Sequence, residues 1–144
     1  MAFQNPSQSE IEELLRTART IAVVGLAGDP AKPSYGVARG LQQFGYRILP
    51  VNPREQAVLG EPAFPDLAAA QAALEPGETI DIVDVFRRPE HIDAIVDECV
   101  RLGLKALWIQ QGIINEAAAN RARDAGMFVV MDRCLYSTRK AMRT

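Results

Sequence analysis

The distribution of apolar residues along the chain predicts helices and strands in alternation. A helix is expected over about 7–19, because Ser7 and Glu10 form a capping-box pattern and apolar residues follow at helical spacing. The run 21–25 is apolar without alternation, which is typical of a strand buried on both of its faces. A helix followed by a fully buried strand indicates a sheet that helices cover on both sides.

The same patterns place the remaining elements. Further strands are predicted over 47–51, 80–86, 106–110 and 128–131, with one short strand inside 58–67. Further helices are predicted over 35–44, 68–74, 89–102, 115–125 and 137–142. This alternation predicts an α/β fold of the Rossmann-like type, with three α/β/α layers and a mainly parallel five-stranded sheet.

Composition narrows the class of protein. The chain has 144 residues, 48% of them hydrophobic and 24% charged, which is ordinary for one globular domain over 1–144. This composition excludes a disordered chain, and no apolar run approaches the ~20 residues of a membrane span. The 16 basic and 18 acidic residues give a net charge of −2, so no basic excess points to nucleic acid.

The counts of cysteine and histidine bear on metals and on location. Cys99, Cys134 and His91 are too few and too widely spaced for a zinc site. The first residues lack a basic-then-apolar signal pattern. We therefore expect no bound metal, and a cytoplasmic protein with free thiols.

Ligands of parallel α/β sheets bind beyond the C-terminal ends of the strands, where the strand order switches. After the first strand the chain reads GLAGDPAKPSYG, from Gly25 to Gly36. This loop matches neither GxGxxG nor the P-loop pattern, but it leads into a helix whose free amides would favour a phosphate. Gly36 and Gly40 share a helix face, which predicts a close approach of that helix to the sheet. The alternative is that the glycines serve only turns and packing.

The second strand ends in Val51-Asn52-Pro53-Arg54. Folds that bind NAD usually carry an Asp or Glu here for the ribose hydroxyls, whereas this segment has no carboxylate and ends in a cation. Arginine binds phosphate through a forked pair of hydrogen bonds, so the segment favours NADP or coenzyme A (CoA), which both carry a ribose phosphate. A solvated loop arginine is the alternative.

Two later strand ends offer further contacts. Phe86-Arg87-Arg88-Pro89 places a ring beside two cations, an arrangement that could stack on a base and contact phosphate. The alternative is one core ring and two exposed arginines. Gln110-Gln111-Gly112 supplies amides that can bind a ligand without acid or base catalysis.

Groups suited to catalysis are scarce, and none is assigned that role. His91 falls in the first turn of a helix, with no nucleophile motif to complete a triad. Asp81 and Asp84 lie three apart on a strand, so they point to opposite faces and cannot form an acid–base pair. Cys134 follows the last strand on the ligand side, where a thiolate could meet a ligand thiol; a small buried apolar residue is the alternative.

The motifs PSYGVA, PVNP, VDVFR, WIQQG and MDRC make the chain resemble the small stand-alone CoA-binding proteins over about 19–134. Those proteins resemble the N-terminal CoA-binding domain of the succinyl-CoA synthetase alpha subunit. The resemblance implies a CoA site built from the strand ends, with its phosphates on the first loop. The candidate CoA-binding residues are Gly25, Leu26, Ala27, Lys32, Pro33, Ser34, Tyr35, Gly36, Asn52, Pro53, Arg54, Val85, Phe86, Arg87, Arg88, Gln111, Gly112 and Cys134.

The chain also departs from its relatives. The synthetase carries its phosphorylated histidine on a second domain, whereas one nucleotide fold nearly fills these 144 residues and His91 lies in another segment. We therefore expect no ligase activity. Relatives tend to carry a glutamate shortly after the cysteine, where residues 135–138 here read LYST.

Three hypotheses for the function follow. The first is binding of CoA or an acyl-CoA without catalysis, as a carrier, sensor or partner subunit, with no nucleic-acid or membrane partner and with a protein partner or a second copy as options. The second is an NADP-dependent oxidoreductase or a CoA-transferring enzyme that a partner chain completes. The third is a redox module in which Cys134 forms a mixed disulfide with CoA.

Overall fold

Five parallel strands form the central sheet of the computed structural model, which describes residues 2–143. The strands are β1 (Thr20–Val24), β2 (Arg47–Val51), β5 (Ile82–Val85), β6 (Ala106–Ile109) and β7 (Phe128–Met131). Their order across the sheet is β2-β1-β5-β6-β7, and every neighbouring pair is parallel. Nearly all strand residues are buried, as their continuous apolar runs predict.

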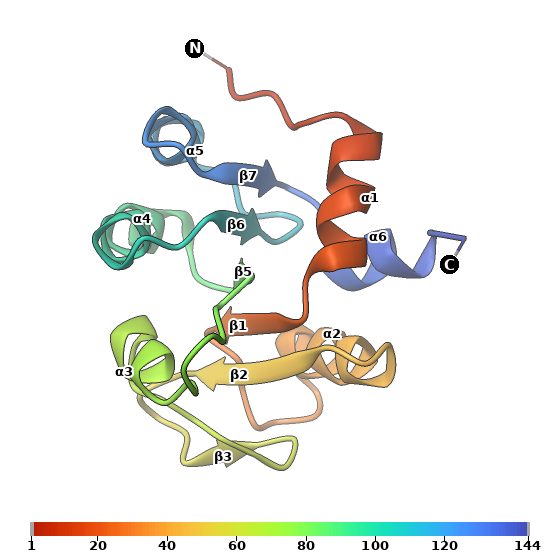
Figure 1. Ribbon diagram of the computed structural model, residues 1–144, viewed down its shortest axis with the longest axis vertical. Coiled ribbons are helices and arrows are strands. Elements are labelled where there is room, and N and C mark those ends of the chain that lie inside the picture. The colour runs from red at the N-terminus through yellow and green to blue at the C-terminus, as the bar shows by residue number, and fades with distance from the viewer. Residues whose placement is uncertain (1, 144) are drawn as a thin grey trace.

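Helices cover both faces of this sheet, so the molecule has three layers (Figure 1). One face carries α1 (Gln8–Thr17), α2 (Pro33–Gln43) and α6 (Leu135–Lys140). The other carries α3 (Leu67–Ala72), α4 (Ile92–Leu102) with the 3-10 turn η1 (Pro89–His91) before it, and α5 (Glu116–Asp124). An apolar core lies on each side of the sheet, which confirms the predicted α/β/α architecture. No helix among the described residues is long and apolar enough to cross a membrane.

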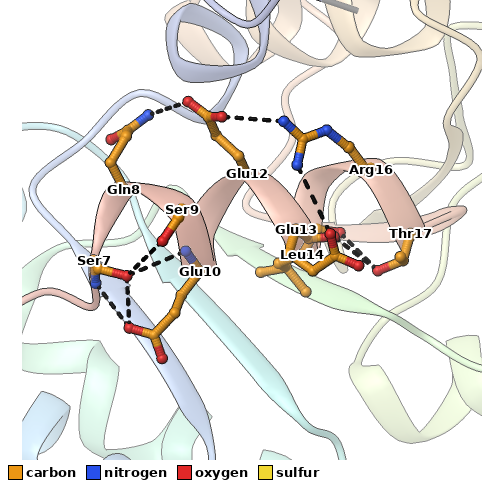
Figure 2. Close-up of polar contacts among 9 residues, drawn as sticks. All are labelled: Ser7, Gln8, Ser9, Glu10, Glu12, Glu13, Leu14, Arg16 and Thr17. Carbon is orange, nitrogen blue, oxygen red and sulfur yellow. Dashed lines mark hydrogen bonds and ion pairs between the residues drawn. The ribbon is translucent and has the colours of Figure 1, made fainter.

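The first helix begins where its capping pattern predicts (Figure 2). The Ser7 hydroxyl accepts the Glu10 N–H at 3.2 Å, and the Glu10 carboxylate accepts the Ser7 N–H at 3.1 Å. On the exposed side, the Glu12 carboxylate accepts bonds from Gln8 and Arg16 at 3.1 and 3.2 Å. The Ser7 and Glu10 contacts supply hydrogen-bond partners for backbone N–H groups at the start of α1. The apolar side of the helix packs against the sheet.

Several bounds differ from the predicted ones by one to three residues, and three of the differences have a cause that the structure shows. Residues 58–67 hold no strand of the main sheet, because β3 (Ala57–Val58) and β4 (Glu61–Pro62) pair only with each other in a small antiparallel hairpin. Helix α2 begins at Pro33, two residues early, since the fixed φ of proline suits a first helical turn. Helix α6 begins at Leu135, also two residues early, where the buried Gln110 side chain accepts the Leu135 N–H at 2.9 Å.

The glycines of α2 do not both bring the helix close to the sheet, so that expectation is wrong. A Cβ at Gly40 would overlap the ring of Tyr136 on α6. A Cβ at Gly36, one turn earlier, would meet open space. Gly40 therefore permits the close contact of two helices on one face of the sheet.

The β7 edge of the sheet is closed by a side chain. Asn5, in the segment before α1, donates from Nδ2 to the Met131 carbonyl at 3.0 Å and accepts the Met131 N–H at 2.8 Å. Asn5 is partly exposed, whereas Met131 is buried. The asparagine thus takes the place that a neighbouring strand would occupy, and it ties the N-terminal segment to the end of the chain's last strand.

The strand order reverses direction between β1 and β5. The chain first moves from β1 outward to β2, then returns past β1 to β5 and continues to β7. The loops after β1 and β5 therefore diverge at this point, which is where open α/β sheets bind their ligands.

Candidate functional site

A cleft of about 540 Å³ opens at the strand-order switch, between the loops that follow β1 and β5. We call it the switch-point cleft. Its lining residues are Gly25, Ala27, Lys32, Pro33, Ser34, Phe86, Arg87, Arg88, Pro89, Gly112 and Ile113. Half of the candidate CoA-binding residues are thus brought together around one opening, although they come from three loops far apart in the sequence.

Gly25 fixes how closely the two loops approach. Its φ is +87°, a left-handed conformation that residues with a side chain rarely adopt. A Cβ at this position would lie 2.5 Å from the Phe86 carbonyl oxygen. The Gly25 N–H meanwhile donates to the Val51 carbonyl at 2.8 Å, which ties the loop to the end of β2. Only glycine fits this junction of three strand ends.

Two amides of the β1–α2 loop are bound by side chains of the protein itself and are not free for a ligand. The Ala27 N–H donates to the buried Ser34 hydroxyl at 3.1 Å. The Gly28 N–H donates to the Glu55 carboxylate at 2.7 Å. The loop is therefore held in shape by its own chain, and a phosphate would meet it through the remaining groups and the nearby cations.

The end of β2 supports this loop from beneath. The Asn52 side chain donates to the Leu26 carbonyl at 3.1 Å and accepts the Arg54 N–H at 3.0 Å. Pro53 and Arg54 are exposed and are not among the residues that line the switch-point cleft. Residues 51–54 hold no carboxylate, as the sequence analysis states, but Glu55 follows directly and its side chain accepts the Gly28 N–H of the loop.

Cations dominate the charged groups of the switch-point cleft. Lys32 comes from the first loop, and Arg87 and Arg88 follow β5. Among residues 2–143, no acidic side chain forms an ion pair with any of the three, and no carboxylate lines the cleft. Two further lining residues, Pro89 and Ile113, are absent from the list of candidate CoA-binding residues, although each directly follows one of them in the chain. A positively charged cleft with an aromatic wall suits a phosphorylated nucleotide.

The other candidates lie around this cleft rather than in it. Leu26 and Val85 are fully buried in the two cores, so only their backbones can face a ligand. Tyr35, in the first turn of α2, packs against the core, and Gly36 is exposed on the same helix. Gln111 and Cys134 line a second opening.

This second opening, the thiol cleft, has a volume of about 370 Å³. Its lining residues are Gln8, Gln111, Asp132, Arg133, Cys134, Ser137, Thr138 and Ala141. It adjoins the switch-point cleft through the turn Gln111-Gly112, and the Gly112 N–H donates to the Asp132 carboxylate at 2.8 Å. Asp132 holds a left-handed backbone with φ +62° to make this contact.

The two cysteines have opposite chemical characters. Burial, with a smaller effect of Glu98, raises the pKa of the Cys99 thiol to about 12, so this thiol stays neutral. Burial also raises the pKa of the half-buried Cys134, but hydrogen bonds from Ser137, the Gln110 side chain and the Tyr136 N–H outweigh it and bring the pKa below its ordinary value. Only Cys134 is suited to react as a thiolate.

The two aspartates of the β5 region also differ. Asp81 lies just before β5, and its carboxylate accepts the Arg19 and Thr20 N–H groups at 2.8 and 2.9 Å, which joins two strand starts. Asp84 lies inside β5 with no exposed surface. The sequence analysis considered Asp84 only as a partner of Asp81 in an acid–base pair. A single acidic residue within an apolar strand already indicates a buried carboxyl group.

A third cleft, of about 520 Å³, lies at the opposite edge of the sheet, near the N-terminal ends of β5 and β6. Its lining includes four carboxylates, Glu10, Glu13, Glu78 and Asp81, beside one cation, Lys105. This acidic lining disfavours a phosphorylated ligand, in contrast to the cationic lining of the switch-point cleft.

Comparisons with known proteins agree with the resemblance seen in the sequence. The family model described as a CoA binding domain matches residues 19–139. The uncharacterized protein YneT of Bacillus subtilis is 39% identical over 133 residues, covering 92% of this chain and 94% of that protein. A solved structure from Thermus thermophilus has a TM-score of 0.84 at 38% identity and covers 94% of this chain and 98% of its own.

One relative is much longer. The alpha subunit of an ADP-forming acetate–CoA ligase from Pyrococcus furiosus is 32% identical over 92 residues, which cover 63% of this chain but only 19% of that subunit. The family match, which extends over most of the chain, confirms the resemblance inferred from the motifs. This protein belongs to the family of CoA-binding domains.

Proposed function

We propose that the chain binds CoA or an acyl-CoA in the switch-point cleft and catalyses no reaction there by itself. The observation that carries the proposal is the convergence of Lys32, Arg87 and Arg88 on one cleft at the strand-order switch of a CoA-binding-domain fold. A CoA molecule carries a diphosphate and a ribose phosphate, and charge-assisted hydrogen bonds to such groups are among the stronger polar contacts in proteins.

The surroundings support a binding role. Gly25 and Ala27 leave the cleft floor without bulky side chains, so a diphosphate can approach the backbone closely. Phe86, which is partly buried against the core, is the aromatic residue of this lining and the group on which we expect the base to stack. Among the described residues, the cleft lining holds no histidine, carboxylate or cysteine that could serve as an acid, base or nucleophile. Cys134 and Gln111 stand at the adjoining thiol cleft, where the pantetheine arm would end.

Isothermal titration calorimetry under reducing conditions tests the proposal. CoA, dephospho-CoA, NADP and NAD are compared on one protein sample. We expect CoA to bind tightest and removal of its 3′-phosphate to weaken binding about tenfold or more, because a charge-assisted contact contributes roughly 1.5–3 kcal/mol. Tighter binding of NADP than of CoA would overturn the proposal in favour of an NADP enzyme.

A charge-matched pair of variants localises the site. Arg88→Ala removes one cation from the switch-point cleft, and we expect it to weaken CoA binding by about tenfold or more. Arg101→Ala removes the same charge from an exposed position on α4, where Arg101 makes only a 3.9 Å ion pair with Glu98. This control should leave the affinity unchanged; an equal loss in both variants would mean that only net charge matters.

A further inference from the structure

Two adjoining clefts of opposite charge lie at the edge of the sheet that faces away from the switch-point cleft. One is the third cleft described above, which we call the acidic cleft. The other, the arginine cleft, has a volume of about 350 Å³ and lies where the ends of α1, α2 and α6 come together (Figure 1). Its lining residues are Leu15, Arg16, Ala18, Arg19, Phe44, Gly45, Tyr46 and Arg139. Ala18, at the end of α1, lines both clefts, so they lie side by side.

The charges of the two clefts are only partly compensated within the chain. The lining of the arginine cleft holds three arginines and no carboxylate. Among residues 2–143, no carboxylate forms an ion pair with Arg19. In the acidic cleft, the side chain of Glu13 is 69% exposed and makes only a 3.8 Å ion pair with Arg16. The other carboxylates there already accept hydrogen bonds from the chain, which leaves Glu13 the most available of them.

An exposed aromatic ring stands at the arginine cleft. Phe44 is 40% exposed, and the Arg139 guanidinium lies over its ring, 4.5 Å from the centroid. The Arg139 Nε donates to the Tyr46 hydroxyl at 3.1 Å, which fixes the cation beside the ring. Ring and cation therefore form one unit with an apolar part and a positive charge.

The acidic cleft has the complementary character. Leu14 and Phe128, which are both partly buried, line it together with its four carboxylates. A ring that carries a cation matches apolar walls with carboxylates beside them. Since a surface with two adjoining patches of opposite charge is complementary to itself after a half-turn, the partner that fits this edge best is a second copy of the chain.

We propose that two copies of the chain associate about a twofold axis near Ala18, with the Phe44–Arg139 unit of each copy in the acidic cleft of the other. The arginine and acidic clefts adjoin, so one rotation forms both contacts and the assembly closes as a dimer. Glu13 of each copy then faces Arg19 of the other. Both switch-point clefts stay open, because they lie at the other edge of the sheet.

Sedimentation velocity over a wide range of protein concentrations, at low and at high salt, tests the association. We expect a reversible monomer–dimer equilibrium that shifts toward the monomer as salt rises, because salt screens exposed charges. A monomer at every concentration would overturn the proposal and leave the edge to a different partner. Growth into assemblies larger than a dimer would overturn the twofold arrangement.

A pair of charge reversals tests which groups meet. Glu13→Lys and Arg19→Glu each place like charges opposite each other, so each variant alone should be monomeric where the wild type is dimeric. A mixture of the two should form dimers with one copy of each, since both contacts then join opposite charges again. No recovery on mixing would overturn this pairing. Neither residue lines the switch-point cleft, so calorimetry with CoA reports on the proposed function separately.

A matched pair of truncations tests the aromatic contact. Phe44→Ala should weaken the dimer by roughly tenfold or more, because buried aromatic anchors dominate the affinity of interfaces. Ile114→Ala is the control, since Ile114 is 51% exposed and follows the turn at the switch-point cleft, at the other edge of the sheet. This control should leave the monomer–dimer equilibrium unchanged. An equal loss in both variants would show that exposed apolar surface in general drives association, which would contradict the proposal.

Discussion

At the scale of single residues, the identity of one residue at each of two positions determines how the loops of the site are held. Gly25 has a backbone and surroundings that admit no Cβ, and Glu55 fastens the loop that Gly25 begins. The sequence marks Gly25 clearly, because a glycine directly after a buried strand is typical of a ligand loop. Glu55 could not be predicted, since the reach of a flexible carboxylate to an amide 27 positions away depends on the tertiary fold.

Gly25→Ala should destabilise the protein. The left-handed backbone costs of order 1–3 kcal/mol for a residue with a side chain, and the clash with the Phe86 carbonyl adds to it. Gly36→Ala is the matched control, because its Cβ meets open space on an exposed helix face, and it should stabilise by roughly 0.5–1 kcal/mol. Urea unfolding measures both. Equal free energies of unfolding for the two variants would contradict this account of Gly25.

Asp84 should make stability depend on pH. Its folded pKa is raised, so its contribution to stability is full below the unfolded value near 3.9 and is lost as the pH rises through the folded value. Relative to the native residue, Asp84→Asn should therefore gain stability above about pH 4, by up to ~1.4 kcal/mol per pH unit, until the difference levels off. Unfolding free energies are compared from pH 4 to 8 in a Cys134→Ser background. Parallel curves would show that Asp84 is not held neutral.

At the scale of elements, the sequence predicts the regular parts well and the irregular parts poorly. The strands over 47–51 and 128–131 have the predicted bounds, because buried strands carry a strong apolar signal. The β3–β4 hairpin was mistaken for one strand, since two-residue strands leave almost no pattern. The early start of α6 depends on Gln110, a contact between segments 25 positions apart that no local pattern reveals.

The segment before α1 should be coupled to β7 through Asn5. Asn5→Ala leaves the N–H and carbonyl of the buried Met131 without these partners, and we expect a loss of about 1–3 kcal/mol. Hydrogen exchange of the Met131 amide should also become faster. Gln4→Ala, one residue earlier in the same segment, is the control. Unchanged exchange at Met131 would mean that Asn5 does not protect this edge in solution.

At the scale of the whole molecule, the strand order organises the function. Reversal between β1 and β5 brings the segments around Gly25 and Arg87 to one opening, whereas the predicted basic contact at Arg54 lies outside it. The sequence identified the segments by the rule that strand ends bind ligands. The sequence could not show which of these segments line the same cleft. That depends on which loops diverge in space and on which side chains already hold the β1–α2 loop.

A crystal structure of the protein with CoA tests the central claim most directly. We predict the diphosphate beside Gly25, Ala27 and Lys32, with Arg87 or Arg88 on a phosphate and the thiol end near Gln111. CoA bound in the acidic cleft at the opposite edge of the sheet, beside Asp81 and Glu13, would contradict the account, as would a complex whose phosphates touch none of the switch-point cleft.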